Sequence, residues 1–279
     1  MDWLKALILG IVQGASEYLP ISSSGHLAIF RSILGVDLPV SQQLQFDVMV
    51  HFATVLSTIV ILWPMFRKLC AGFFRFDGSP DFVYVCKVLV SCIPVGIVGV
   101  FFKKQVEEIF GEGLLVVGIC LMCTAILLAF AYFSGFDRRT GKPVPADRGR
   151  DISWKDAFII GCAQAVAVLP GLSRSGSTIA TGILLGDKRG QVATFSFIMV
   201  ILPIVGESLL DLAKMLSPAA EAAETASPIG ATAMLAGFAS AFLVGCAACK
   251  WMIALVKKGK LIWFSLYCLA AGLLCLLWQ

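Results

Sequence analysis

The sequence predicts an all-α polytopic membrane protein with an inverted-topology repeat, containing six transmembrane helices and two re-entrant helix-turn-helix hairpins. Three observations predict it: an apolar composition, a series of bilayer-length apolar segments, and an internal duplication centred on a polar turn. Residues 1–279 are expected to form a single integral membrane domain, since no long polar domain fits between the apolar segments.

The composition excludes a water-soluble fold. The chain is 58% hydrophobic and only 14% charged, whereas soluble domains average about 25% charged residues. Six segments could cross a hydrocarbon core of about 30 Å, and they cover residues 46–66, 82–102, 114–133, 192–212, 229–248 and 261–277. The N-terminal apolar run is not a signal peptide, because Gln13 and Glu17 interrupt it.

The basic residues predict the orientation in the membrane. When the segments are threaded in order, fourteen lysines and arginines fall on one side and five on the other. The rich side is cytoplasmic by the positive-inside rule, so both termini face outward. The net charge of +4 therefore reflects topology, and no nucleic-acid partner is expected.

Ten cysteines are present, and two CxxC pairs, Cys120/Cys123 and Cys246/Cys249, lie in the middle of predicted spans. A zinc site needs more polar partners than these segments offer. The cysteines are therefore interpreted as small packing residues.

An internal repeat appears when the sequence is aligned with itself at an offset of 151 residues. Identical pairs occur at Trp3/Trp154, Ala6/Ala157, Ile8/Ile159, Gly10/Gly161, Gln13/Gln164, Ser22/Ser173, Ser24/Ser175 and Gly25/Gly176. Residues 1–136 form the first repeat, a hairpin followed by three spans, and residues 151–279 form the second. An odd number of spans inserts the second repeat upside down.

Each repeat begins with a segment that is too short and too polar at its end to cross the bilayer. Pro20 and the serines after it break the first helix, and the stretch from Pro170 to Thr178 does the same in the second repeat. Irregular backbone at membrane depth needs protein or water around it, so the two turns should share one pocket. The active site is expected there, on the outer, periplasmic side.

The pocket collects residues that lipid does not tolerate. A charge at the bilayer centre costs at least about 2.5 kcal/mol, so Glu17 and Arg174 are functional candidates. A purely structural ion pair is the alternative for these two residues. Hydroxyl-rich turns that open onto helix N-termini bind anions, and an arginine fork matches phosphate oxygens. The expected substrate-binding residues are Ser22, Ser24, Ser173, Arg174, Ser175 and Thr178, with Ser177 in the same pocket.

Metal and proton-transfer roles are also predicted. Gln13 and Glu17 are one helical turn apart and form a half-site for a divalent cation, Mg²⁺ or Ca²⁺. His26 follows the serine turn and could move a proton. Asp47 and His51 could line the entrance or could act as capping or supporting residues, whereas Glu207 and Asp211 receive no chemical role.

These motifs resemble the undecaprenyl-pyrophosphate phosphatase family, the bacitracin-resistance type, over essentially the whole chain. Its first signature is similar to residues 13–17 with Ser22-Ser23-Ser24-Gly25-His26, and its second is similar to residues 170–178. The stretch Phe195-Ser196-Phe197 before Pro203 is similar as well.

The resemblance implies metal-dependent hydrolysis of undecaprenyl pyrophosphate, a long-chain prenyl pyrophosphate lipid, to the monophosphate in the bacterial plasma membrane. This reaction regenerates the carrier for cell-wall precursors. The resemblance further implies metal binding or catalysis by Glu17, proton transfer by His26, nucleophilic attack by Ser23 and phosphate binding by Arg174. Gln13 stands where many relatives carry glutamate. Either a serine or a water molecule could be the attacking nucleophile. A homodimer is also possible.

Two other functions are consistent with part of this sequence. The acid-phosphatase-like lipid phosphatases need a second histidine after a Ser-Arg pair, and no histidine follows His51. A lipid-phosphate flippase or transporter fits the inverted repeat equally well. The density of catalytic residue types in one pocket favours the hydrolase.

Overall fold

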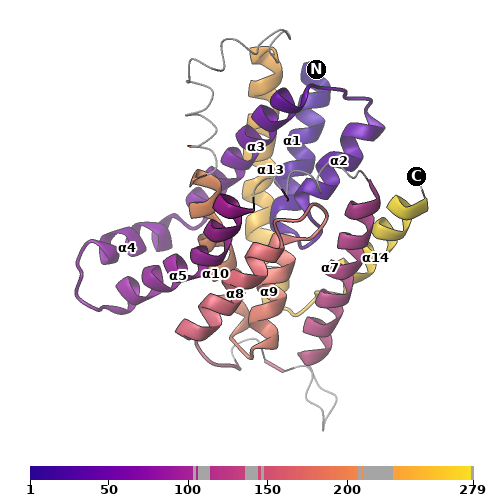
Figure 1. Cartoon of the computed structure of the whole chain (residues 1–279). Helices are drawn as coiled ribbons and strands as arrows, with labels where there is room; N and C mark the ends of the chain where they lie inside the picture. The colour runs from indigo at the N-terminus through magenta and orange to yellow at the C-terminus, as the bar shows by residue number, and fades with distance from the viewer. Residues whose placement is uncertain are drawn as a thin grey trace.

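The structure is a computed structural model that describes residues 1–102, 105, 114–135, 144–145, 148–206, 209 and 229–277. The described chain is almost entirely helical, which confirms the predicted all-α class (Figure 1). The helices are α1 (Trp3–Tyr18), α2 (Ser23–Ile33), α3 (Val40–Ile61), α4 (Trp63–Phe73), α5 (Pro80–Phe101), α7 (Leu114–Ser134), α8 (Trp154–Val166), α9 (Arg174–Leu184), α10 (Arg189–Met199), α13 (Ala231–Lys257) and α14 (Ile262–Leu277).

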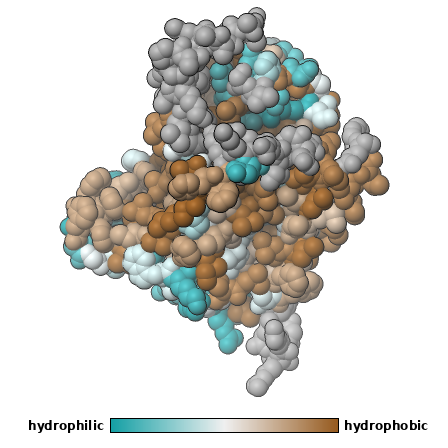
Figure 2. Space-filling model, viewed as in Figure 1, coloured by the Kyte–Doolittle hydropathy of each residue, from teal (hydrophilic) through white to brown (hydrophobic). Residues whose placement is uncertain are grey.

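Five stretches of the described helices are long and apolar enough to cross a membrane, and α14 is a shorter apolar helix of 16 residues. These five are Gln42–Ile61, Pro80–Phe101, Leu114–Ser134, Arg189–Gly206 and Ala231–Lys257. Within the described residues, each of the six predicted segments is helical over most of its length, although the last is shorter than a full span and the part of the fourth after Gly206 lies largely outside the described residues. Figure 2 shows apolar side chains over much of the visible surface, with polar patches toward the upper and lower ends of the view.

The first span ends earlier than the sequence suggested. It was expected to continue to Phe66, but α3 ends at Ile61 and α4 begins at Trp63. Pro64 lies in the first turn of α4, where its missing N–H costs no hydrogen bond. Inside a continuous helix the same ring would clash with the preceding turn, so the chain breaks at Leu62.

Each hairpin packs on a helix from the other half of the chain. In the first hairpin α1 packs along α13, and in the second α8 packs along α5. Gly10 and Gly161, which are aligned in the repeat, sit at these two contacts. A Cβ atom at Gly10 would overlap Ser240 and Gly237, and one at Gly161 would overlap Ser91. The glycines therefore allow the close helix approach that interlocks the halves.

The last span, α14, packs along α7, and their backbones approach closely at Gly118 and Gly272. Ser265 fixes the pair by donating a hydrogen bond to the carbonyl of Ala125, 2.6 Å away. Both chain ends lie toward the upper part of Figure 1, whereas the beginning of α8 and the end of α9 lie toward the bottom.

Some sequence-based assignments fall outside the described residues. Glu207 and Asp211 are among them, as are six of the basic residues used for the orientation: Lys103, Lys104, Arg138, Arg139, Lys142 and Lys214.

Candidate active site

The two hairpin turns are built alike. Ser22 caps α2 by accepting a hydrogen bond from the N–H of Gly25 (3.3 Å), and Ser173 caps α9 by accepting one from the N–H of Gly176 (3.0 Å). These are aligned residues of the repeat. Each cap hydroxyl also lies 3.4 Å from the hydroxyl two residues later. Both turns therefore present the positive end of a short helix.

The turns touch each other. The Ser175 hydroxyl of the second hairpin donates to the carbonyl of Leu19 in the first, at 3.2 Å. The α-carbon of Gly176 also packs near Pro20, because a Cβ atom there would lie 3.1 Å from the proline Cβ. The predicted meeting of the two polar turns is thus present in the structure.

Glu17 is the centre of the hydrogen-bond network between the turns. It lies in the last turn of α1, and its side chain is only 9% exposed. Its Oε2 atom accepts from the Gln13 amide at 2.9 Å and from the Ser23 hydroxyl at 2.6 Å. A hydroxyl that donates to a carboxylate at this distance can lose its proton to that carboxylate.

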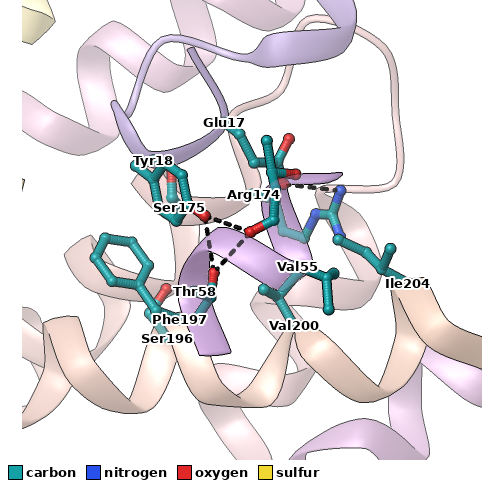
Figure 3. A pocket seen from close by; sticks show the side chains of 11 residues that line it. Glu17, Tyr18, Val55, Thr58, Arg174, Ser175, Ser196, Phe197, Val200 and Ile204 are labelled. Carbon is teal, nitrogen blue, oxygen red and sulfur yellow. Dashed lines mark hydrogen bonds and ion pairs between the residues drawn. The ribbon is translucent and has the colours of Figure 1, made fainter. Parts of the chain in front are cut away.

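Arg174 reaches Glu17 from the other half of the chain. Its Nη2 atom lies 3.5 Å from Glu17 Oε1, and 28% of its side chain remains exposed (Figure 3). Arg174 is the first residue of α9, directly after the cap. The guanidinium therefore stands beside a helix N-terminus, and both features favour an anion.

His51 is the second residue beside Glu17. Its Nε2 atom lies 3.5 Å from Glu17 Oε2, while its Nδ1 atom bonds to the carbonyl of Asp47 at 2.7 Å. The Asp47 carboxylate in turn pairs with Arg31 of α2. His51 therefore contacts the Glu17 carboxylate directly, whereas Asp47 is a supporting residue that holds His51.

A narrow, partly open cleft with a cavity volume of about 20 Å³ lies beside the ion pair. Glu17, Arg174 and Ser175 lie at its polar end (Figure 3). Four apolar residues contribute to its wall, namely Val55, Phe197, Val200 and Ile204. A ligand with a phosphate at one end and a hydrocarbon at the other matches this division.

Four further hydroxyl-bearing residues line the cleft, namely Tyr18, Thr54, Thr58 and Ser196, and of these the sequence had singled out only the stretch around Ser196. The Tyr18 hydroxyl bonds to the Thr54 carbonyl (2.5 Å) and to the Ser57 and Thr58 hydroxyls (2.5 and 2.9 Å), which fixes α1 to α3. Ser196 lies 2.5 Å from the Thr178 hydroxyl. The only sequence signal for Tyr18 was its place directly after Glu17.

The remaining predicted residues lie around this centre. Thr178 bonds back to the Arg174 carbonyl at 2.9 Å and so supports the arginine. Ser24 is close to Ser22, and the buried Ser177 hydroxyl has no hydrogen-bond partner among the described residues. His26 is buried and bonds to Ser22 and to Tyr267 of α14.

The donor set is suited to a hard divalent cation. Glu17 offers a carboxylate, and the buried Oε1 atom of Gln13 has no hydrogen-bond partner among the described residues. Those residues contain no cluster of three or more His, Cys, Asp and Glu side chains that could enclose a metal. Mg²⁺ commonly uses one or two protein oxygens and completes its shell with water and substrate phosphate, so the residues fit that ion.

Comparison with known proteins covers the whole of this architecture. Residues 6–274 match the family described as Bacitracin resistance protein BacA. An undecaprenyl-diphosphatase of Parabacteroides distasonis is 54% identical over 273 residues, covering 98% of this chain and 97% of the relative. One from Bacteroides thetaiotaomicron is 52% identical over all of both chains. A third, from Desulfatibacillum aliphaticivorans, is 34% identical over 98% of this chain and 97% of its own.

The match extends from the first helix of the first hairpin to the last span, and it includes both polar turns and the cleft between them. The chain therefore belongs to the bacitracin resistance protein BacA family.

Proposed function

We propose that the protein is an undecaprenyl-diphosphatase, which hydrolyses undecaprenyl pyrophosphate to undecaprenyl phosphate and inorganic phosphate. The observation that carries the proposal is the contact between Glu17 and Arg174 at the polar end of an apolar cleft. The relatives that bear this name match essentially the full chain. Release of the monophosphate would recycle the lipid carrier for cell-wall synthesis and would account for bacitracin resistance.

In this proposal Arg174 binds the terminal phosphate. Its planar fork can hold two phosphate oxygens and can stabilise the charge that develops during transfer. The N-termini of α2 and α9 add the positive ends of two helix dipoles. Ser175 borders the same end of the cleft. Ser22, Ser24, Ser173 and Thr178 shape the turns that hold these groups in place.

Glu17 accepts the proton of the attacking group. If Ser23 attacks, its hydroxyl proton passes to Glu17 Oε2, with which it already shares a 2.6 Å hydrogen bond. If water attacks instead, Glu17 can take the water proton in the same way. In either case the anhydride P–O bond breaks and the lipid monophosphate leaves. Attack by water releases inorganic phosphate directly. Attack by Ser23 leaves a phosphoserine, and a water molecule, whose proton passes to Glu17, must then break the serine O–P bond to release inorganic phosphate and restore the serine.

The family resemblance implies that His26 returns a proton to the lipid leaving group. Both of its ring nitrogens are hydrogen-bonded within the protein, to Ser22 and to Tyr267, so a bracing role is the alternative for this residue.

The apolar wall accepts the start of the prenyl chain. Val55, Phe197 and Val200 face the same cleft as the charged pair, so the diphosphate can reach Arg174 while the hydrocarbon stays in an apolar environment. The rest of a long prenyl chain would extend into the bilayer.

A divalent cation, Mg²⁺ or Ca²⁺, completes the proposed site. Glu17 and Gln13 would hold it through the carboxylate and the free amide oxygen. The ion would neutralise charge on the diphosphate, and the side chains would keep their roles in binding and proton transfer.

We place the protein in the bacterial plasma membrane, with both termini outside and the active site toward the outer face. The support is the excess of basic residues on the opposite side, including Arg150, Lys155 and Lys188. The inverted repeat, with residues 1–136 and 151–279 as its halves, belongs to the same proposal, and the paired glycine contacts at Gly10 and Gly161 support it.

A homodimer is proposed through the outer face of α5. Only 17% of the apolar stretch of α5 is buried within the protein, against 33% to 50% of the corresponding stretches in the other candidate spans. The mass of the protein in detergent, measured by light scattering, tests this directly. A monomeric mass in several detergents would contradict the proposed homodimer.

The experiment that tests the function measures phosphate release from a long-chain prenyl diphosphate by purified protein. Wild type should release phosphate with Mg²⁺ or Ca²⁺ and stop when a chelator is added. Arg174→Ala and Glu17→Ala should lose activity while eluting as folded protein in detergent. Wild-type rates in both variants would reject the site.

A lipid-phosphate flippase is the second candidate. The observation that favours it is the pair of broken helices whose turns meet in the interior, as in transporters. Labelled lipid phosphate in proteoliposomes that contain Arg174→Ala tests it. Translocation by this hydrolysis-deficient variant would support the flippase, and the absence of translocation in wild type as well as in the variant would leave hydrolysis alone.

A further inference from the structure

His26 has both of its ring nitrogens in hydrogen bonds. Nδ1 lies 2.8 Å from the Ser22 carbonyl oxygen, and Nε2 lies 2.6 Å from the hydroxyl of Tyr267. A carbonyl oxygen can only accept, so Nδ1 carries the proton. In the neutral ring Nε2 is then an acceptor, and the Tyr267 hydroxyl donates to it.

The residue that His26 holds has an unusual backbone. Ser22 has φ 71° and ψ 100°, and it is one of two non-glycine residues with positive φ among the described residues. Such a conformation costs about 1–3 kcal/mol and persists only where neighbouring groups enforce it. The Ser22 carbonyl accepts two hydrogen bonds from His26, one from Nδ1 and one from the backbone N–H at 3.1 Å.

The strained residue sets the direction of the next one. Ser23 follows Ser22 directly, and its hydroxyl donates to Glu17 at 2.6 Å. A rotation of the Ser22–Ser23 peptide would therefore move the Ser23 hydroxyl away from the carboxylate. Small displacements of this kind can cost large factors in rate.

The second hairpin provides an internal comparison. The residue aligned with Ser22 is Ser173, which has an ordinary φ of −71°. The position aligned with His26 is Ser177, whose hydroxyl has no hydrogen-bond partner among the described residues. The turn without strain therefore lacks the histidine brace, and the strained turn has it.

Residues beside Tyr267 on α14 form hydrogen bonds that dock this part of the helix. Two residues earlier, Ser265 bonds to Ala125 of α7 at 2.6 Å. The next residue, Cys268, donates to the Pro20 carbonyl at 3.4 Å. The ring of Tyr267 is nearly parallel to that of His26, at 18° and 5.5 Å between centroids. The hydroxyl is thus presented to His26 from a rigid helix.

We infer that Tyr267 is a positioning residue for the hydrolysis reaction: its hydroxyl holds the ring of His26 at Nε2, so that the Nδ1–H of His26 braces Ser22 and aims Ser23 at Glu17. The inference rests on the proposed function and deepens it. Tyr267 does not line the substrate cleft and acts only through His26.

The first test is Tyr267→Phe, which removes the hydroxyl and keeps the ring. Phosphate release from a long-chain prenyl diphosphate should slow about tenfold in kcat, as for other residues that orient a functional group, with KM within about twofold. The chain has two histidines, so ¹⁵N-histidine NMR in detergent can follow His26. Wild type should show the Nδ1–H form with a hydrogen-bonded Nε2, and the variant should lose the Nε2 signature.

Ser265→Ala is the matched control, because it removes one of the two side-chain hydrogen bonds that dock this part of α14 and keeps the other, from Cys268 to Pro20, together with the Tyr267 hydroxyl. It should keep both the wild-type rate and the wild-type histidine spectrum. Equal slowing in Ser265→Ala and Tyr267→Phe would mean that α14 docking alone matters, and it would overturn the inference.

Two substitutions of His26 separate positioning from direct catalysis. His26→Asn places an amide N–H near the position of Nδ1, whereas His26→Gln places one near Nε2. The inference predicts that Asn keeps more activity than Gln, and that Tyr267→Phe slows His26→Asn no further. A full additional effect of Tyr267→Phe in that background would overturn it.

The NMR measurement distinguishes the inference from the proposed function. If wild type releases no phosphate, the proposed function fails, whereas the tautomer of His26 and its response to Tyr267→Phe are still measured. A wild-type rate and an unchanged spectrum in Tyr267→Phe would overturn the inference while the function stands.

Discussion

Glu17 and Arg174 lie 157 positions apart in the sequence, yet their side chains approach to 3.5 Å. Glu17 lies in the last turn of the first helix of the first hairpin, and Arg174 begins the second helix of the second hairpin. The acid and the guanidinium can therefore act on one ligand only when both hairpins are docked.

Arg174→Lys should lower phosphate release by about 100-fold, because a lysine keeps the charge but loses the planar fork that holds two phosphate oxygens. Lys188→Gln is the matched control, since it removes a positive charge near the other end of α9 from an exposed pair with Asp151. It should keep the wild-type rate. Equal losses in the two variants would point to net charge rather than to geometry.

Gly10→Val should destabilise the protein by about 1–3 kcal/mol, because the added side chain has to displace α13 from α1. Gly161→Val should do the same between α8 and α5. The check is the thermal unfolding midpoint in detergent. Gly99→Ala is the control, since a Cβ atom there meets nothing within 4 Å, and it should be neutral or stabilising by up to about 1 kcal/mol.

Asp187 should make stability depend on pH. It lies outside the membrane spans, and burial together with the Asp156 carboxylate raises its pKa to about 6, from 3.8. The folded state therefore binds this proton more tightly than the unfolded state, so stability falls as the pH rises from about 4 to beyond 6.

Asp187→Asn cannot ionise, and it should unfold at a higher temperature than wild type at about pH 7.5 but not at about pH 4.5. Asp151→Asn is the control, because hydrogen bonds from Lys188 and Gln191 lower the pKa of Asp151. It should show no such gain at neutral pH. A gain of equal size in both variants at both pH values would contradict the assignment to Asp187.

Gln13→Glu should lower the Mg²⁺ concentration needed for half-maximal phosphate release, because a second carboxylate strengthens a hard-cation site. Gln13→Ala should raise it. Titration of the chelated enzyme with Mg²⁺ provides the measurement. An unchanged requirement in both variants would remove Gln13 from the metal site.

Much of the fold could be predicted from the sequence because it depends on local signals. Bilayer-length apolar segments predicted the spans, and the aligned turns at Ser22 and Ser173 predicted two capped hairpins that meet. The break at Leu62 was missed because the apolar run continues past it. Pro64 was the available signal.

The candidate site was harder to predict, since most of its contacts join distant segments. Glu17, Ser23 and Arg174 carried a signal of their own, because charged and polar side chains are costly in a membrane. His51 was noticed, but nothing in the sequence showed that it would reach Glu17 from α3. Tyr267 lies 241 residues from His26, on a span whose composition is typical of lipid-facing helices, so only the folded structure reveals the pairing.

The shared action of Glu17 and Arg174 on one phosphate is tested most directly by a double-mutant cycle. Glu17→Asp and Arg174→Lys shorten or replace each group while leaving measurable activity, and phosphate release is compared in wild type, both single variants and the double variant. Groups that act as a unit are not additive, so the double variant should be no more than about tenfold slower than the slower single variant. Rate losses that multiply in full would show that the two residues act independently, and they would contradict the account.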